Sequence, residues 1–445
     1  MGVPRSDETA TRLVSRSIRA SVPSLRVALD ALPAPRTFWT GPDEATVVAG
    51  GVAAELTADG RDRFAAVREG IDRVLRSGDV HAGTEAACPR LFGGFAFHDD
   101  GGDGAVWADF PGARFVLPRV QVTETDRGTW LTVNAVGPDA TAAAVEERLD
   151  AERERLAGLD DADAGPPPEI ASRTRTTPRD AWRDSVEAAV ERIRAGDLRK
   201  VVLAQALDVT LDRPLSVPDV LARLGSTYPD CYRFLVEPTA GPDRPSFFGA
   251  TPERLVSRHG RTVTTGALAG TTGRGDTPAE DDWLAEELLD DEKNVHEHEL
   301  VAETIREQLA PFASSITTGE RSVRRLETVQ HLFTPITATL DRDTHVLDLV
   351  EALHPTPAVG GLPPERALAT IRDTEPFDRG WYAAPVGWVD AAGNGTFAVA
   401  IRSALARETS TTLFAGVGVV ADSDPDREWD EVQLKYRPIL DELER

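Results

Sequence analysis

Lysine is almost absent from this sequence, so the few lysines present are the first candidates for chemistry. Three of the 49 basic residues are lysines and the others are arginines. The first, Lys200, opens the apolar run KVVLAQAL, which predicts a strand on which this lysine shares a face with valine and alanine. A lysine at the start of a strand is most often solvated. Unlike arginine, however, a lysine in apolar surroundings can release its proton and act as a base. Both interpretations stay open at this point.

A second charged group lies near the C-terminus, in a predicted helix that begins at Pro425 behind a serine–aspartate cap. Glu428, Glu431 and Lys435 fall on one face of this helix because they are spaced at helical intervals. The ordinary interpretation is a solvated glutamate–lysine pair. The alternative is a Mg²⁺-binding carboxylate beside an ammonium group, which together suit an anionic ligand.

The stretch 278–309 predicts one long helix with a matching pair, Lys293 and Glu297, one turn apart. Its HEHE segment contains His296 and His298, which point in different directions on a helix and cannot share a zinc ion. Carboxylates and substrate oxygens are the ligands that Mg²⁺ prefers. We therefore expect magnesium rather than zinc.

One arginine and two glycine-rich segments are further candidates for binding an anion. The stretch 396–406 alternates like a core strand and places Arg402 on a face of alanines, where its charge requires a partner. That partner is either a protein carboxylate or a substrate carboxylate. The segments 416–421 and 265–277 form neither a dinucleotide-binding unit nor a phosphate loop, but their backbone N–H groups suit an anion.

The composition excludes several classes of protein. The chain has 445 residues, 74 of them acidic, and a formal net charge of −25, so a nucleic-acid partner is not expected. No apolar run is long enough to span a membrane, and the first residues lack the apolar core of a signal peptide. We therefore expect a cytoplasmic protein with no membrane partner. Excess acid with scarce lysine is typical of halophilic adaptation, because molar salt screens self-repulsion.

The order of predicted elements indicates a mixed α+β fold with large, mostly antiparallel sheets packed face to face and helices outside. Residues 1–165 are rich in predicted strands, and we expect them to belong to the same fold as the region 175–445, which holds the charged groups. The proline-rich stretch 159–178 predicts a linker or a surface connection. The predicted strands include 90–97, 114–124, 129–136, 246–250, 254–257, 261–267, 384–390, 396–405 and 412–420.

Together these segments resemble the chorismate-utilising enzymes, which include the anthranilate, aminodeoxychorismate, salicylate and isochorismate synthases. The matching segments extend from about residue 180 to the C-terminus and follow one another in the same order as in the family. The matching segments are RKVVLAQ, FFGATPERLV, TGALAGTTGRG, KNVHEHELV, VQHLFT, HPTPAVGG, RGWYAAPVGWVD, FAVAIRSAL and AGVGVVADSDPDREWDEVQLKYRPI. The N-terminal 170 residues match only loosely. The resemblance implies the fold of this family, chorismate as the substrate and Mg²⁺ as the cofactor.

The resemblance also implies roles for individual residues. Lys200 corresponds to the base that activates water for attack at C2, and Glu253 to the acid that protonates the leaving 4-hydroxyl. Glu297 and Glu431 correspond to the two Mg²⁺ glutamates, with Glu428 behind them. Asn294 is a further candidate there, and it departs from the acid that several relatives carry. The expected substrate contacts are Gly270, Thr271, His331, Ala358, Tyr382, Arg402, Gly416, Gly418 and Lys435. Burial among small apolar residues is expected to favour the neutral amine of Lys200, whereas Lys435 stays charged.

Two positions point to a subtype. A lysine at position 200 is typical of the members that add water, and Ala358 in HPTPAVGG resembles the isochorismate synthases, since other members tend to carry threonine there. The resemblance therefore implies reversible conversion of chorismate to isochorismate, without a glutaminase subunit. The product would feed menaquinone, which we favour, or a salicylate-type siderophore. The alternatives are a salicylate synthase, an amine-adding anthranilate or aminodeoxychorismate synthase, and an inactive metal-binding relative.

Overall fold

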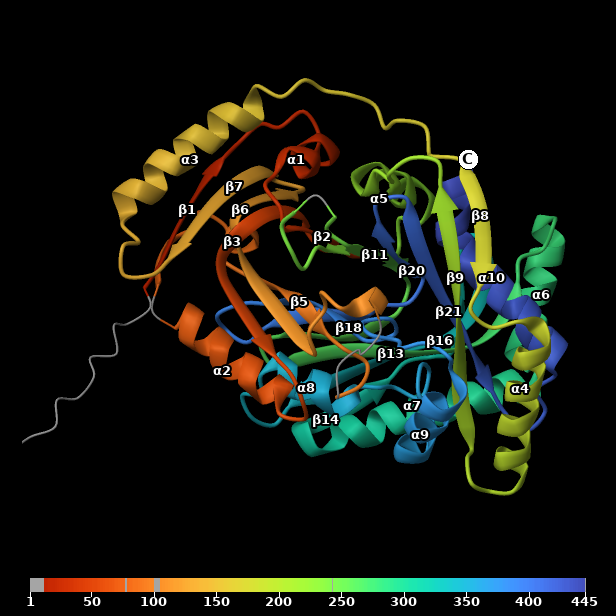
Figure 1. Ribbon diagram of the computed structural model, residues 1–445. Helices are drawn as coiled ribbons and strands as arrows, with labels where there is room; N and C mark the ends of the chain where they lie inside the picture. Colours follow the sequence, from red (N-terminus) through yellow and green to blue (C-terminus); the bar gives the residue numbers. More distant parts are fainter. Residues whose placement is uncertain (1–11, 77, 100–104, 242, 445) are drawn as a thin grey trace, which may run out of the picture.

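Antiparallel strand pairing organises this chain and connects segments that are far apart in sequence (Figure 1). The computed structural model describes residues 12–76, 78–99, 105–241 and 243–444. Within these ranges all strands belong to one hydrogen-bonded network, in which only β1 and β4 pair in parallel. The strands are β1 (Leu13–Arg19), β2 (Arg36–Thr40), β3 (Thr46–Ala58), β4 (Gly78–His81), β5 (Leu91–Phe95), β6 (Ala113–Thr125), β7 (Gly128–Val136), β8 (Ile170–Arg175), β9 (Lys200–Leu211), β10 (Tyr232–Val236), β11 (Ser246–Thr251), β12 (Arg254–His259), β13 (Thr262–Gly273), β14 (Ala313–Thr318), β15 (Ser322–Arg325), β16 (Val329–Leu340), β17 (Gly361–Leu362), β18 (Pro385–Val389), β19 (Gly395–Val399), β20 (Ser403–Arg407) and β21 (Ser410–Val419).

Helices cover this network from outside, as the sequence predicts. They are α1 (Leu25–Ala31), α2 (Arg63–Leu75), α3 (Ala142–Ala157), α4 (Arg179–Arg194), α5 (Val217–Thr227), α6 (Pro278–Asp290), α7 (Glu292–Leu309), α8 (Val346–Leu353), α9 (Pro364–Thr374) and α10 (Pro425–Glu444). The predicted α+β class with mostly antiparallel sheets is confirmed. Among the described residues, no helix combines the length and the apolar character needed to cross a membrane.

Strands from the N-terminal part pair directly with strands from the C-terminal part. β2 pairs with β10, so that Phe38 lies opposite Leu235, and β5 pairs with β18, so that Phe92 lies opposite Trp388. Buried apolar side chains from both parts form one continuous core. The connection after α3 runs along the periphery to β8 (Figure 1). Burying both sets of side chains in a shared core makes the two parts mutually dependent for stability.

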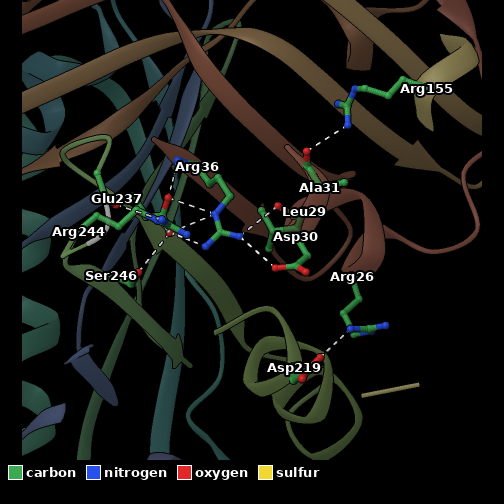
Figure 2. Close-up of polar contacts among 11 residues, drawn as sticks. Arg26, Leu29, Asp30, Ala31, Arg36, Arg155, Asp219, Glu237, Arg244 and Ser246 are labelled. Atoms are coloured by element: carbon green, nitrogen blue, oxygen red, sulfur yellow. Dashed lines mark hydrogen bonds and ion pairs between the residues drawn. The ribbon is translucent and has the colours of Figure 1, made fainter. Parts of the chain in front are cut away.

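A buried ion pair reinforces the junction between β2 and β10. The Arg36 guanidinium donates to Glu237 Oε1 at 2.8 Å from Nη2, and Arg244 and Ser246 donate to the same carboxylate (Figure 2). Glu237 is fully buried and Arg36 nearly so. A buried carboxylate requires such donors, because desolvation without partners would be costly.

The strand that begins at Lys200 lies deep in the sheet. β9 pairs along most of its length with β21, from Val201 opposite Val419 to Thr210 opposite Ser410. Its other edge pairs with β17 at one end and with β8 at the other. Its residues are buried almost throughout, which explains the near-continuous apolar run in the sequence.

Three predicted elements have different boundaries in the structure. The helix expected over 278–309 is two helices, because Asp291 has an extended backbone and caps α7 by accepting the N–H of Asn294 at 2.8 Å. The strand expected over 396–405 is interrupted between β19 and β20, where Arg402 has a positive φ of 52°. The expected linker over 159–178 includes β8, which pairs with β9.

Candidate active site

One cavity collects all the site residues that the sequence predicts. It has a volume of about 420 Å³ and lies where β9, β13 and β21 meet α7 and α10. The predicted residues in its wall are Lys200, Glu253, Gly270, Thr271, Glu297, His331, Ala358, Tyr382, Arg402, Gly416, Gly418, Glu431 and Lys435. Charged and polar side chains from distant segments therefore converge on a space of the size that holds a small organic molecule.

Lys200 is buried in the wall of this cavity and forms an ion pair. Its Nζ lies 2.7 Å from Glu297 Oε1, and its side chain is 1% exposed. Small buried residues flank Lys200 on β9, as the sequence predicts, and α7 in addition places a carboxylate against its amine. A lysine at this position, unlike an arginine, can take part in proton transfer.

Glu253 occupies a different part of the cavity wall, directly after β11. Its side chain is buried, and burial raises the pKa of its carboxyl to about 7, although the positive charges of Lys200 and Lys435 oppose the shift. The backbone fixes this residue, because its N–H donates to Thr251 Oγ1 at 3.2 Å and its carbonyl accepts the N–H of Val399 at 3.0 Å. A carboxyl that keeps its proton near neutral pH is suited to act as a general acid.

Arg402 presents an unsatisfied hydrogen-bond donor in this cavity. Its side chain is buried, and its Nη1 has no hydrogen-bond partner, while its Nη2 lies 3.3 Å from His331 Nε2. His331 Nδ1 in turn lies 3.0 Å from Thr271 Oγ1. Burial, followed by the charge of Arg402, lowers the pKa of His331 well below its usual value, so the ring is neutral. We assign the Nδ1–H tautomer, because Nε2 must accept from the guanidinium.

The structure bears on the two partners considered for Arg402. It gives Arg402 no carboxylate within ion-pair distance among the described residues. Its charge is buried and its Nη1, which has no hydrogen-bond partner, is in the cavity wall, an arrangement that suits the carboxylate of a bound ligand.

A group of carboxylates and lysines lies on the α7 and α10 side of the cavity. Glu431 Oε1 lies 2.7 Å from Lys435 Nζ, and this ammonium also donates to the carbonyl of Gly416 at 3.0 Å. Glu428 Oε1 lies 3.6 Å from Lys293 Nζ, which gives the third lysine of the chain a partner. Burial and the nearby charge of Glu431 raise the pKa of Glu428 to about 7.

The donors in this group fit a magnesium ion. Glu297, Glu428 and Glu431 supply hard carboxylate oxygens in one cavity wall, and a lysine ammonium lies against each of them, as expected where carboxylates need a cation. Among the described residues, no three histidine, cysteine or acidic side chains are gathered closely enough to hold a metal by themselves. The donor set suits an ion that takes one or two carboxylates and completes its shell with water or substrate oxygens.

Asn294 links the two walls of the cavity. Its Nδ2 donates to Asp291 Oδ1 at 2.8 Å, and its Oδ1 accepts the N–H of Thr271 at 3.3 Å. Gly270, just before Thr271, has a positive φ of 78° and lies against Asn294. An amide can donate and accept at once, whereas an acid at this position would face Asp291 with a second negative charge.

Three charged residues of the cavity wall are absent from the sequence-based predictions, namely Asp291, Arg379 and Arg427. In the sequence, Asp291 falls inside a predicted acidic helix, so its role as a helix cap could not be predicted. Arg379 stands at the head of the segment RGWYAAPVGWVD, but nothing in its spacing separates it from the many other arginines. Arg427 lies in the first turn of α10, one residue before Glu428. Only the tertiary structure brings these residues to the cavity.

Comparison with known proteins identifies the family of this chain. The family described as "Chorismate binding enzyme" matches residues 6–444, and the chain belongs to this family. It is 36% identical to the isochorismate synthase MenF of Bacillus subtilis, over 92% of this chain and 88% of that protein. It is 38% identical to a salicylate biosynthesis isochorismate synthase of Pseudomonas aeruginosa, over 94% of this chain and 86% of that protein. The structure of MenF, the menaquinone-specific isochorismate synthase of Escherichia coli, matches with a TM-score of 0.80 at 25% identity, covering 97% and 94% of the two chains.

Proposed function

We propose that this protein is an isochorismate synthase, which adds water at C2 of chorismate and releases the hydroxyl group at C4. The observation that carries this proposal is the buried pair of proton-transfer groups, Lys200 and Glu253, in the wall of a cavity that also holds the free donor of Arg402. Family membership and the names of the similar proteins support the same substrate.

Substrate binding uses the positive groups of the cavity. Chorismate carries two carboxylates, and Arg402 has one unsatisfied buried donor to offer to one of them. The Tyr382 hydroxyl and the backbone of Gly416 lie next to each other in the same cavity wall, since a β-carbon at position 416 would be 3.1 Å from Tyr382 Oη. Lys435, held by Glu431 and Gly416, is a further contact for a substrate carboxylate. Holding both ends of the substrate fixes the ring for reaction.

Proton transfer divides between two side chains. Neutral Lys200 takes a proton from the water that attacks C2, while protonated Glu253 gives a proton to the C4 hydroxyl, which leaves as water as the double bond shifts. Lys200 must first give up its ion pair with Glu297, because an ammonium group cannot accept a proton. Magnesium, when held by Glu297 and Glu431, would supply positive charge for the ring carboxylate.

Product analysis tests this proposal directly. Purified protein is incubated with chorismate and Mg²⁺ in molar KCl, and isochorismate is the expected product. Substantial salicylate from the same mixture would favour a salicylate synthase, and an aminated product in the presence of ammonia would favour an amine-adding enzyme. Turnover by a Lys200→Ala variant equal to that of the wild type would overturn the assigned mechanism.

We further propose a cytoplasmic enzyme that acts on chorismate without a glutaminase subunit, since water is the nucleophile. The catalytic groups all come from residues 175–445, and we propose that residues 1–165 complete the same fold through β2 and β5. Similar proteins are named for both menaquinone and salicylate formation. We favour menaquinone as the destination of the product.

A further inference from the structure

One edge of β9 lacks a partner strand where the strand lines the cavity. β17 pairs only with Lys200 and Val201, and β8 pairs only from Leu207 onward. Val202 and Ala204 fall between these two partners. Buried backbone groups without hydrogen bonds are costly, so this gap must be closed by other groups.

The carbonyl of Gly360 accepts the N–H of Val202 at 2.9 Å, and Thr176 binds the backbone of Ala206. The side chains of Glu375 and Arg379 close the part of the gap between them. Glu375 Oε1 accepts the N–H of Ala204 at 2.8 Å, and Arg379 Nη2 donates to the carbonyl of Val202 at 2.8 Å. The two side chains also bind each other, at 2.8 Å between Nε and Oε2 and at 2.5 Å between Nη2 and Oε1. Arg379 is 1% exposed and Glu375 is 3% exposed. An ion pair thus takes the place of a strand beside β9.

The same arginine reaches two other segments of the cavity wall. Its Nη1 donates to the carbonyl of Val359 at 2.8 Å, next to Ala358, and its own carbonyl accepts the N–H of Tyr382 at 2.8 Å. Its guanidinium also lies 4.5 Å from the centre of the Phe97 ring. One residue therefore contacts the strand of Lys200, the loop of Ala358 and the turn of Tyr382.

We propose that Glu375 and Arg379 are positioning residues, which hold Lys200, Ala358 and Tyr382 in register for catalysis. This inference rests on the proposed function. A buried ion pair contributes little net stability compared with an apolar pair of similar volume, because both charges lose their water. Its directional hydrogen bonds, however, fix relative position, and small displacements of reacting groups are expensive in rate.

The test compares this pair with the other buried pair described above. Glu375→Gln and Arg379→Lys are matched with Glu237→Gln and Arg36→Lys, whose side chains are equally buried but do not line the cavity. All four variants are expected to lower the melting temperature. Only Glu375→Gln and Arg379→Lys are expected to lower kcat, by about 10- to 100-fold, with KM for chorismate changing much less. Arg379→Lys should retain more activity than Arg379→Met.

A second measurement works without substrate. Amide exchange at Ala204 should accelerate in Glu375→Met, which has no carboxylate or amide oxygen to accept the N–H, and stay unchanged in Glu237→Met, because only Glu375 accepts that N–H. Unchanged exchange at Ala204 would overturn the positioning role whatever the activity. So would kcat values, per folded molecule, that equal those of the two control variants. A wild-type protein that forms no isochorismate would instead refute the proposed function, and the two failures are distinguishable.

Discussion

Gly418 lies so close to Glu297 that a β-carbon at position 418 would be 2.7 Å from the Oε1 atom of that carboxylate. The same β-carbon would be 2.8 Å from Lys200 Cε. Real side chains do not approach so closely, so the ion pair between Lys200 and Glu297 has its present geometry only because residue 418 has no side chain. This relationship leads to the first prediction.

Gly418→Ala is expected to displace Lys200 and Glu297 and to lower kcat by roughly 100-fold, because the proposed mechanism places both groups at the reacting centre. Some loss of stability, about 1–3 kcal/mol, is expected from overpacking. Steady-state kinetics and thermal unfolding measure the two effects. Gly273→Ala is the control, since a β-carbon there meets nothing within 4 Å. Equal activity of the two variants would contradict the prediction.

Lys200→Arg separates charge from proton transfer. Arginine can keep an ion pair with Glu297 but cannot act as a base, so we expect turnover to fall by about 10²–10⁴-fold. Binding of chorismate, measured by titration calorimetry, should weaken far less. A Lys200→Arg variant that keeps more than a tenth of the wild-type kcat would show that no proton leaves this residue.

The raised pKa of the Glu253 carboxyl leads to a prediction of how activity depends on pH. Burial raises the pKa of this carboxyl to about 7, so its acid form is present below that pH and is lost as the pH rises through it. Because the proposed mechanism uses Glu253 in its protonated form, kcat/KM should fall above about pH 7. A pH profile of the wild type, compared with Glu253→Gln, checks this. The glutamine variant should have low activity with no such decline, and a wild-type rate that keeps rising well above pH 7 would argue against the acid role.

The net charge predicts a dependence on salt. At low ionic strength the 74 acidic residues repel one another with a formal net charge of −25, and molar salt shortens the screening length to about 3 Å. The melting temperature is therefore expected to rise substantially between dilute buffer and 2 M KCl, as differential scanning fluorimetry would measure. A melting temperature that does not change with KCl would contradict halophilic adaptation.

The helical part of the site could be predicted because its geometry is local. Glu428, Glu431 and Lys435 lie on one face of α10 as their spacing requires, and Asp424 caps that helix by accepting the N–H of Asp426 at 3.1 Å. The strand that starts at Lys200 could also be predicted, because its long apolar run corresponds to a strand that is buried almost throughout.

Contacts between distant segments could not be predicted in this way. The ion pair of Lys200 with Glu297 joins β9 to α7, and that of Lys293 with Glu428 joins α7 to α10. The relative positions of these elements are defined only when the complete sheet has formed. The positive φ of Arg402 was also hidden, because an alternating sequence predicts a regular strand even where the backbone turns. That turn places the guanidinium of Arg402 beside His331 in the cavity wall. The donor proposed to bind the substrate therefore lies on a residue whose backbone conformation could not be predicted from the sequence.

The pairing of β5 with β18 has a consequence for synthesis of the chain. Leu91 pairs with Val389, so one edge of β5 stays without its partner until nearly the whole protein has left the ribosome. In the same way, one edge of β2 has no partner until β10 has been synthesised. Synthesis from the N-terminus therefore leaves apolar strand edges without their partners for most of translation, and unpaired edges of this kind are sites at which chains aggregate.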